Sequence, residues 1–149
     1  MNYLKKNIEN VRILIIEDQL GPMDVYDINF DMAKLEHPEL DNLKIDFATN
    51  FLDAKEKIQN EQYDLIFLDH RMPYEDLGDL QKIDFSAFCH KLKNIGYGLI
   101  DEIKHKQNKV LIIGTSSLCK EEFDNYTIPD KTIDKDDIVN EIVNFLFTN

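Results

Sequence analysis

The sequence has no tryptophan, only two cysteines in 149 residues, and no long hydrophobic run. Its longest apolar runs are about five residues, far short of the ~20 that a membrane-spanning helix needs. No hydrophobic signal segment begins the chain. The two cysteines, Cys89 and Cys119, do not make a disulfide framework and fit a reducing compartment. These absences predict a cytoplasmic protein with no membrane partner.

Positive charge is also scarce, with 17 Lys and Arg residues against 29 Asp and Glu and a formal net charge of −12. Such a chain repels the phosphate backbones of DNA and RNA, so we expect no direct nucleic-acid partner. The acidity suits a bound metal cation or a basic protein partner. The length fits one domain over residues 1–149.

Short aliphatic runs alternate with segments of helical periodicity along the whole chain. The runs are apolar on both faces, which is typical of strands in a parallel sheet covered on both sides. Strand and helix alternate five times, which predicts an α/β fold with a doubly wound, five-stranded parallel sheet. The expected strands lie at residues 11–18, 43–48, 63–69, 109–117 and, more weakly, 125–128; the expected helices lie at 25–35, 50–60, 96–106 and 134–147.

One segment, at about residues 74–95, is an insertion into this alternation. Its apolar residues are spaced as on one amphipathic helix: Ile83, Phe85, Phe88 and Leu92. Two interpretations stay open. The segment either packs on its own domain, or forms a lid or partner surface beside Asp69.

Acids and hydroxyls stand where the predicted strands end. Glu17 and Asp18 end the first strand, Asp69 the third, and Thr115 and Ser116 the fourth. The carboxyl ends of parallel strands meet at one edge of the sheet, where ligands bind. Three carboxylates there repel one another and raise at least one pKa. A hard divalent cation such as Mg²⁺ would relieve the repulsion, with Asp69 exposed at the mouth of its strand.

In this order the motifs resemble the CheY-like receiver domain of two-component response regulators. The acidic pair is Glu17-Asp18, and residues 69–73 match the phosphoacceptor pattern Asp-x-x-Met-Pro. Thr115 stands at the hydroxyl position and Lys131 at the lysine position after the fifth strand. The resemblance implies a flavodoxin-like fold with strand order 2-1-3-4-5.

The resemblance also implies an Mg²⁺-dependent phosphoryl transfer from a phosphohistidine to Asp69. Glu17, Asp18, Asp69 and the backbone carbonyl of Arg71 would hold the metal. Mg²⁺ and Lys131 would offset the charge on the transferred phosphoryl group.

By the same resemblance, the hydroxyl of Thr115 would bind the phosphate and switch a protein–protein surface or prepare a relay. The implied partners are a histidine kinase or phosphotransfer protein and an effector that the sequence does not identify; a homodimer stays open. Such a domain takes part in its own phosphorylation without being an enzyme in the usual sense. The last predicted helix uses the C-terminal residues, so we expect a stand-alone receiver.

Departures from the receiver pattern keep a second class open. Ile128 stands where receivers carry an aromatic residue, and Pro129 interrupts the expected fifth strand. With the long insertion, these features favour a pseudo-receiver that is never phosphorylated and serves as an interaction or dimerisation module. A third class, the aspartate-nucleophile phosphohydrolases, usually has Asp-x-Asp after the first strand, which this chain lacks.

Overall fold

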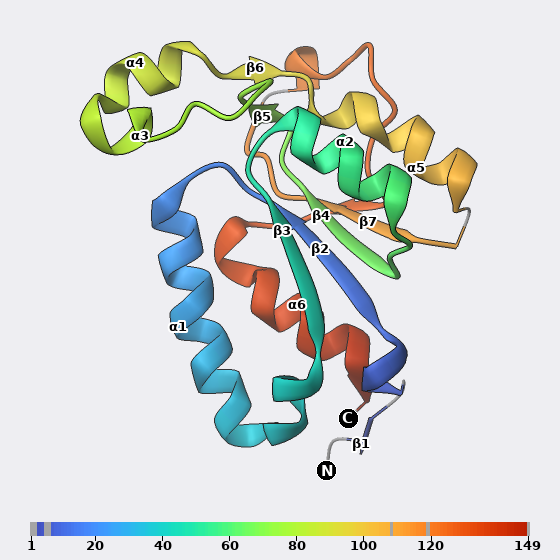
Figure 1. Cartoon of the computed structure of the whole chain (residues 1–149). Helices are drawn as coiled ribbons and strands as arrows, with labels where there is room; N and C mark the ends of the chain where they lie inside the picture. Colours follow the sequence, from blue (N-terminus) through green and yellow to red (C-terminus); the bar gives the residue numbers. More distant parts are fainter. Residues whose placement is uncertain (1–2, 5–6, 108, 119, 149) are drawn as a thin grey trace.

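The computed structural model describes residues 3–4, 7–107, 109–118 and 120–148. Its central sheet has five parallel strands in the order β3-β2-β4-β7-β8 (Figure 1). Counted along the chain, this is the order 2-1-3-4-5, so the predicted α/β fold and topology are confirmed. The strands are β2 (Arg12–Ile16), β3 (Lys44–Ala48), β4 (Leu65–Leu68), β7 (Leu111–Gly114) and β8 (Lys131–Thr132).

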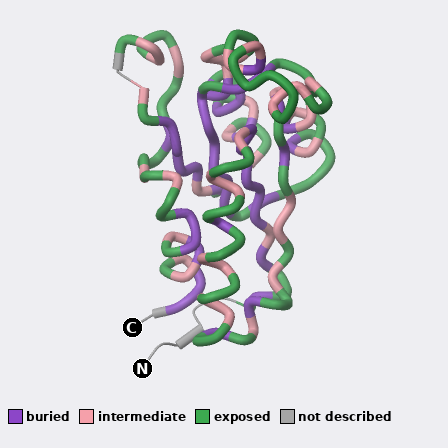
Figure 2. Tube along the Cα trace, turned by 90° about the vertical axis from the view of Figure 1, so that its left-hand side faces the viewer, coloured by how far each residue is buried: buried purple, intermediate pink, exposed green. Residues whose placement is uncertain are grey.

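Helices cover both faces of the sheet, as the two-sided apolar runs predict. The helices α2 (Phe51–Asn60) and α5 (Ile100–Lys106) lie on one face, and α1 (Leu20–Glu36) and α6 (Ile138–Leu146) lie on the other (Figure 1). Side chains alternate along each strand, so successive residues of β2 enter opposite apolar clusters. Buried strands run through the middle of the molecule in Figure 2.

The ends of the helices follow local sequence signals. The side chain of Asn50 accepts a hydrogen bond from the Asp53 backbone N–H at 2.9 Å and so caps α2. Short 3-10 turns lead into α5 (Gly96–Leu99) and α6 (Lys135–Asp137). Others lie at Ile8–Asn10, Pro38–Asn42 and Lys120–Glu122, and the strands β1 (Tyr3–Leu4) and β9 (Phe147–Thr148) pair antiparallel.

One expectation about the edges of the fold is wrong. The fifth strand lies at Lys131–Thr132 and not at residues 125–128, because the chain reaches the β7 edge only after Pro129, where Asp130 N–H donates to the Ile112 carbonyl. The helix at 25–35 exists, but apolar residues whose helical spacing predicts it face outward: Ile28 is 62% and Leu35 is 83% exposed. Helix α1 instead packs through Tyr26 and its neighbours.

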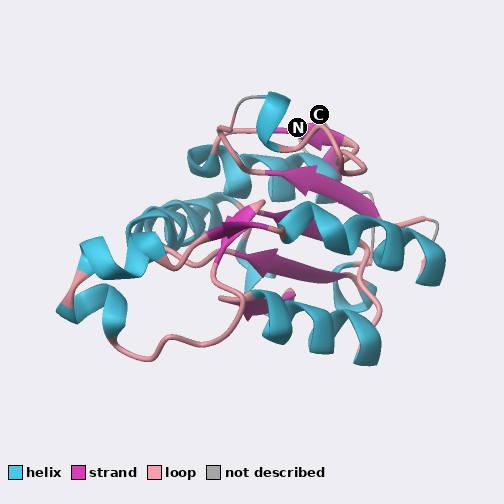
Figure 3. Ribbon diagram, turned by 90° about the horizontal axis from the view of Figure 1, so that it is seen from above, coloured by secondary structure: helices cyan, strands magenta, loops and turns pink. Residues whose placement is uncertain are grey.

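The inserted segment folds into two short helices and not into one amphipathic helix. They are α3 (Leu80–Ile83) and α4 (Phe85–His90), separated at Asp84, whose side chain caps α4. Two antiparallel strands, β5 (Arg71–Met72) and β6 (Lys93–Asn94), close the base of the segment. We call residues 74–92 the arm; α3 and α4 project from the body of the molecule (Figures 1 and 3).

Cys89 is a free cysteine, and Cys119 lies outside the described residues. None of the described helices combines the length and the apolar character needed to cross a membrane.

Candidate functional site

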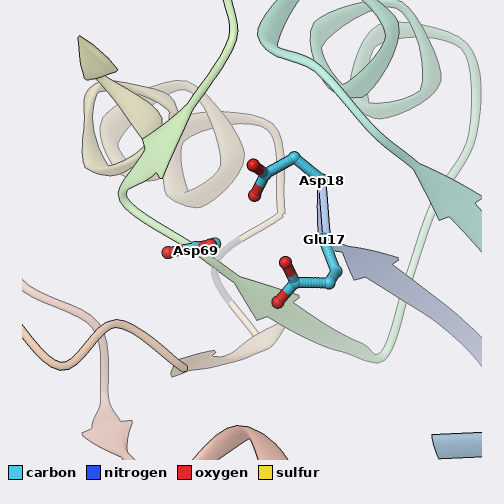
Figure 4. A group of neighbouring side chains, drawn as sticks. All are labelled: Glu17, Asp18 and Asp69. Atoms are coloured by element: carbon cyan, nitrogen blue, oxygen red, sulfur yellow. The ribbon is translucent and has the colours of Figure 1, made fainter. Parts of the chain in front are cut away.

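Strand register brings the predicted acids together. Strands β2 and β4 are parallel neighbours with Ile16 opposite Leu68, so the residues that follow, Glu17 and Asp69, leave the sheet side by side. Asp18 follows on the same loop. Glu17, Asp18 and Asp69 offer carboxylate oxygens that all lie within 4.8 Å of one another (Figure 4).

All three acids are buried, at 3%, 6% and 3% exposure for Glu17, Asp18 and Asp69. The expectation that Asp69 is exposed is therefore wrong. The loop that follows β7 and the turn before α6 cover it, because Ser116 and Lys135 both reach its carboxylate.

The lysine of the site is Lys135, not the predicted Lys131. The Lys135 ammonium lies 2.9 Å from Asp69 Oδ2 and 2.8 Å from Glu17 Oε1. Lys131 is half exposed and pairs with Glu141 of α6 at 2.7 Å. Lys131 belongs to the strand β8 itself and its side chain turns to α6, whereas Lys135 lies in the next turn, above the sheet edge.

The hydroxyl that contacts Asp69 is that of Ser116, and the expected role of Thr115 in binding a transferred phosphate stays a prediction. Ser116 Oγ donates to Asp69 Oδ1 at 2.6 Å and accepts from the His70 backbone N–H at 2.5 Å. Thr115 is buried one residue earlier, where its backbone N–H donates to the Leu68 carbonyl and extends the β4–β7 pairing. The Arg71 N–H also faces Asp69 Oδ1, at 3.3 Å.

His70, next to Asp69, is fully buried and holds the loop in place. Its Nδ1 accepts from the Tyr97 backbone N–H at 2.9 Å, which leaves Nε2–H to donate to the Glu122 carbonyl at 3.2 Å. Burial lowers the pKa of His70, so the ring is neutral. The ring centroids of Tyr97 and Tyr126 lie 4.5 and 4.7 Å from the centroid of the His70 ring. No sequence motif marked this role.

Burial and mutual repulsion disturb the ionisation of the acids. Burial, followed by the charges of Glu17 and Asp69, raises the pKa of Asp18 to about 8. Burial and the charge of Asp69 also raise the pKa of Glu17. Burial alone would lower the pKa of Lys135, but the charges of Asp69 and Glu17 outweigh it and raise that pKa. The expected rise in at least one carboxyl pKa is thus confirmed.

The residues fit a divalent cation. Both carboxylate oxygens of Asp18 are buried and have no hydrogen-bond partner among the described residues. Orphaned buried carboxylate oxygens are costly unless a cation or water satisfies them. When a cation displaces the Asp18 proton, the three carboxylates and the Lys135 ammonium carry a net charge of −2, which matches Mg²⁺ and its preference for oxygen ligands.

A hollow of about 260 Å³ opens beside Asp69. Asp69, Ser116 and Lys135 line it together with Gln19, Arg71, Ser117 and Leu118. It has room for a small anionic group between the Lys135 ammonium and the Ser116 hydroxyl.

Similar solved structures carry the same fold. No protein-family model matches the chain, and neither does any curated protein. The chain is similar to a CheY-like response regulator receiver domain from Methanospirillum hungatei JF-1, with 14% identity, a TM-score of 0.56, and 91% of this chain and 92% of that chain covered. It is also similar to CheY4 of Vibrio cholerae, with 12% identity, a TM-score of 0.57, and 91% and 98% covered. The response regulator TrrA of Thermotoga maritima, solved in complex with Mg²⁺-BeF, gives 20% identity, a TM-score of 0.50, and 91% and 99% covered. The chain therefore has the CheY-like receiver fold.

Proposed function

We propose that this chain is a response regulator receiver in which Asp69 accepts a phosphoryl group, with Mg²⁺ as its cofactor. The observation that carries this proposal is the environment of the Asp69 carboxylate. Lys135 holds one of its oxygens and Ser116 the other, and oxygens of two further acids lie within 4.8 Å, one of them, Asp18, with a carboxylate that finds no hydrogen-bond partner among the described residues. The receiver fold and a structural neighbour solved with Mg²⁺-BeF support it.

In the proposed reaction, an Asp69 oxygen attacks the phosphorus of a phosphohistidine. The O–P bond forms, the P–N bond breaks, and the imidazole leaves with the bonding electron pair and takes up a proton from solvent. The residues of this chain orient the nucleophile: Lys135 and Ser116 hold its two oxygens in place. The Lys135 ammonium also offsets charge on the transferred phosphoryl oxygens.

Glu17, Asp18, Asp69 and the backbone carbonyl of Arg71 are the proposed ligands of Mg²⁺. When bound, Mg²⁺ supplies charge neutralisation at the phosphoryl oxygens. The hydroxyl that we assign to phosphate binding is that of Ser116, because it already touches Asp69. We infer that a histidine kinase or phosphotransfer protein supplies the phosphoryl group and that a protein effector reads the result.

One observation favours the second class, an unphosphorylated interaction module. Lys135 bridges Glu17 and Asp69, so an internal cation already pairs with two of the three acids. It does not reach Asp18 by any contact that the described chain shows, and that carboxyl keeps two buried oxygens without partners. An incomplete neutralisation of this kind supports a site that takes an added cation.

The test is the intact mass of the protein after incubation with phosphoramidate or acetyl phosphate and Mg²⁺. The wild type should gain one phosphoryl mass, and Asp69→Asn should gain none. Asp24→Asn, an exposed acid on α1, is the matched control and should react like the wild type. No gain in the wild type, together with no detectable Mg²⁺ binding, would leave the interaction module as the function.

A further inference from the structure

The arm is attached to the body of the molecule mainly at its base. At the N-terminal side, Pro73 and Tyr74 carbonyls accept from the backbone N–H groups of Phe51 and Leu52 at the start of α2, each at 3.0 Å. At the other side, β6 returns the chain to β5. Between these points, α3 and α4 reach away from the sheet (Figure 3).

A hollow of about 230 Å³ separates the arm from the body. Asp18, Leu20 and Thr49 line it from the body, and Gln81, Lys82 and Phe88 line it from the arm. The arm therefore does not close fully on the body here, and the contacts that cross the hollow help to fix where the arm lies.

Gln81 of α3 makes such a contact, directly to the acidic loop. Its Nε2 donates to the backbone carbonyl of Asp18 at 2.8 Å, and its Oε1 accepts from the backbone N–H of Leu20 at 2.9 Å. Among the described residues, it is the one arm side chain that hydrogen-bonds to this loop. A neutral amide suits the contact because it offers a donor and an acceptor together and brings no charge to a crowded anionic site.

The Leu20 N–H has a particular need for this partner. Leu20 is the first residue of α1, and Gln19 before it gives no side-chain cap. The first N–H groups of a helix have no partner inside the helix. Gln81 thus replaces the missing cap from a position more than 60 residues away in the chain.

The same two hydrogen bonds fix the backbone on both sides of Gln19, directly at Asp18. On the inner side, the Glu17 carboxylate accepts from the Gln19 N–H at 2.9 Å. The backbone that carries the Asp18 carboxyl is therefore held between the site and the arm. A movement of this backbone at the acidic site therefore also changes its hydrogen bonds with the arm, and the reverse holds as well.

We propose that Gln81 is a positioning residue that couples the arm to the cation-binding loop, so that cation binding at Asp18 and closure of the arm stabilise each other. This inference rests on the Mg²⁺ site of the proposed function. The position of the arm would then depend on whether a cation is bound at the acidic site.

The first measurement is the Mg²⁺ dissociation constant of the full chain by NMR titration. Gln81→Ala and Gln81→Met, which keeps the side-chain length, should each weaken binding by roughly three- to tenfold, because the bound loop conformation loses two hydrogen bonds. Two control variants should stay within about twofold of the wild type. Ile83→Ala changes an exposed neutral residue of the same helix, and Gln59→Ala removes a glutamine that bonds to Glu102 far from the site.

The second measurement is amide hydrogen exchange in α3 and α4 with and without Mg²⁺. Coupling is reciprocal, so saturating Mg²⁺ should slow exchange of the arm amides in the wild type by about the factor seen in the affinity. In Gln81→Ala, Mg²⁺ should no longer affect them. A residue that only braces the arm would speed exchange equally with and without Mg²⁺ and leave the dissociation constant unchanged.

The outcomes separate this inference from the proposed function. If the wild type binds Mg²⁺ and Gln81→Ala binds it equally well, the coupling is refuted and the proposed Mg²⁺ site stands. If the wild type binds no Mg²⁺, the metal site and the coupling fail together. Weakened binding in both Gln81 variants, with Mg²⁺-dependent protection lost, supports the coupling.

Discussion

Replacing Asp18 by asparagine should stabilise the metal-free protein at pH 7. Asp18 is buried among Glu17 and Asp69, and its pKa rises from 3.8 to about 8. Between these two values, the unfolded chain has lost a proton that the folded chain still holds. The free energy of unfolding therefore falls as the pH rises through this window.

The size of the effect follows from the same two pKa values. One pKa unit corresponds to about 1.4 kcal/mol, so Asp18 costs the folded protein up to about 4 kcal/mol at pH 7 and about 2 kcal/mol at pH 5. The substituted amide would itself be buried without partners, which costs about 1–3 kcal/mol. The net gain in stability from Asp18→Asn is then about 1–3 kcal/mol at pH 7 and close to zero at pH 5.

Thermal unfolding in EDTA at both pH values measures this gain. For a chain of this size, about 1–3 kcal/mol raises the Tm by roughly 2–10 °C. Asp24→Asn removes the same formal charge from an exposed position and should leave the Tm nearly unchanged. Added Mg²⁺ should raise the Tm of the wild type and much less that of Asp18→Asn. A variant that is less stable than the wild type at pH 7, or a gain equal at both pH values, would refute the reasoning.

Two matched pairs of variants test the rest of the site. Lys135→Met should lower the free energy of unfolding at pH 7 by on the order of 3 kcal/mol, because it leaves buried Glu17 and Asp69 without their cation. Lys131→Met removes a half-exposed ion pair and should lower the free energy of unfolding by under about 1 kcal/mol. Urea unfolding measures both values, and equal losses would contradict the assignment of Lys135 to the site. Gly96→Ala should cost about 2 kcal/mol or more and slow phosphorylation, because its Cβ would lie 1.9 Å from the Asp69 carbonyl oxygen. Gly98→Ala is the control, since the nearest atom to its Cβ would be 3.5 Å away. A Gly96→Ala variant as stable as Gly98→Ala would contradict the prediction and show that the loop at Asp69 moves to accommodate the added Cβ.

The topology and the meeting of the acids could be predicted because both depend on short-range pattern. Runs that are apolar on both faces indicate strands of a parallel sheet covered by helices on both sides. The alternation of strands and helices along the chain then allows only a few topologies of this sheet. Once β2 and β4 are parallel neighbours, Glu17 and Asp69 must emerge together. No long-range information beyond the strand pairing is needed for that step.

The lysine and the hydroxyl could not be assigned by the same means. β8 has two residues, so no alternation of side chains distinguishes Lys131 from Lys135. The difference is made by Asp134, whose side chain caps the turn that carries Lys135 over the site. Likewise, Thr115 and Ser116 are adjacent hydroxyls, and only the end of the β4–β7 pairing decides which one turns to Asp69.

The contact of Gln81 with the acidic loop could not be predicted from the sequence, because it joins residues more than 60 positions apart through backbone atoms. Backbone groups carry no sequence signal, so only the folded arm reveals that a glutamine faces them. The exposed stripe of α1 is a related case: its spacing predicts a helix but not which side of the helix meets the sheet.

No aromatic residue stands at Ile128, but buried aromatic rings lie close to the loop at Asp69. Ile128 is 64% exposed, whereas Tyr97 is 2% exposed and its backbone N–H donates to Nδ1 of His70, the residue after Asp69. The Tyr97 ring fits at this place only because residue 114 is glycine: a Cβ there would lie 2.6 Å from the Tyr97 hydroxyl and from Pro129. The Tyr97 ring packs on His70, and His70 holds the Glu122 carbonyl. His70 therefore connects Ser116, through its backbone N–H, to the turn at Lys120–Glu122, through its ring, and this connection involves no aromatic residue on the edge strand.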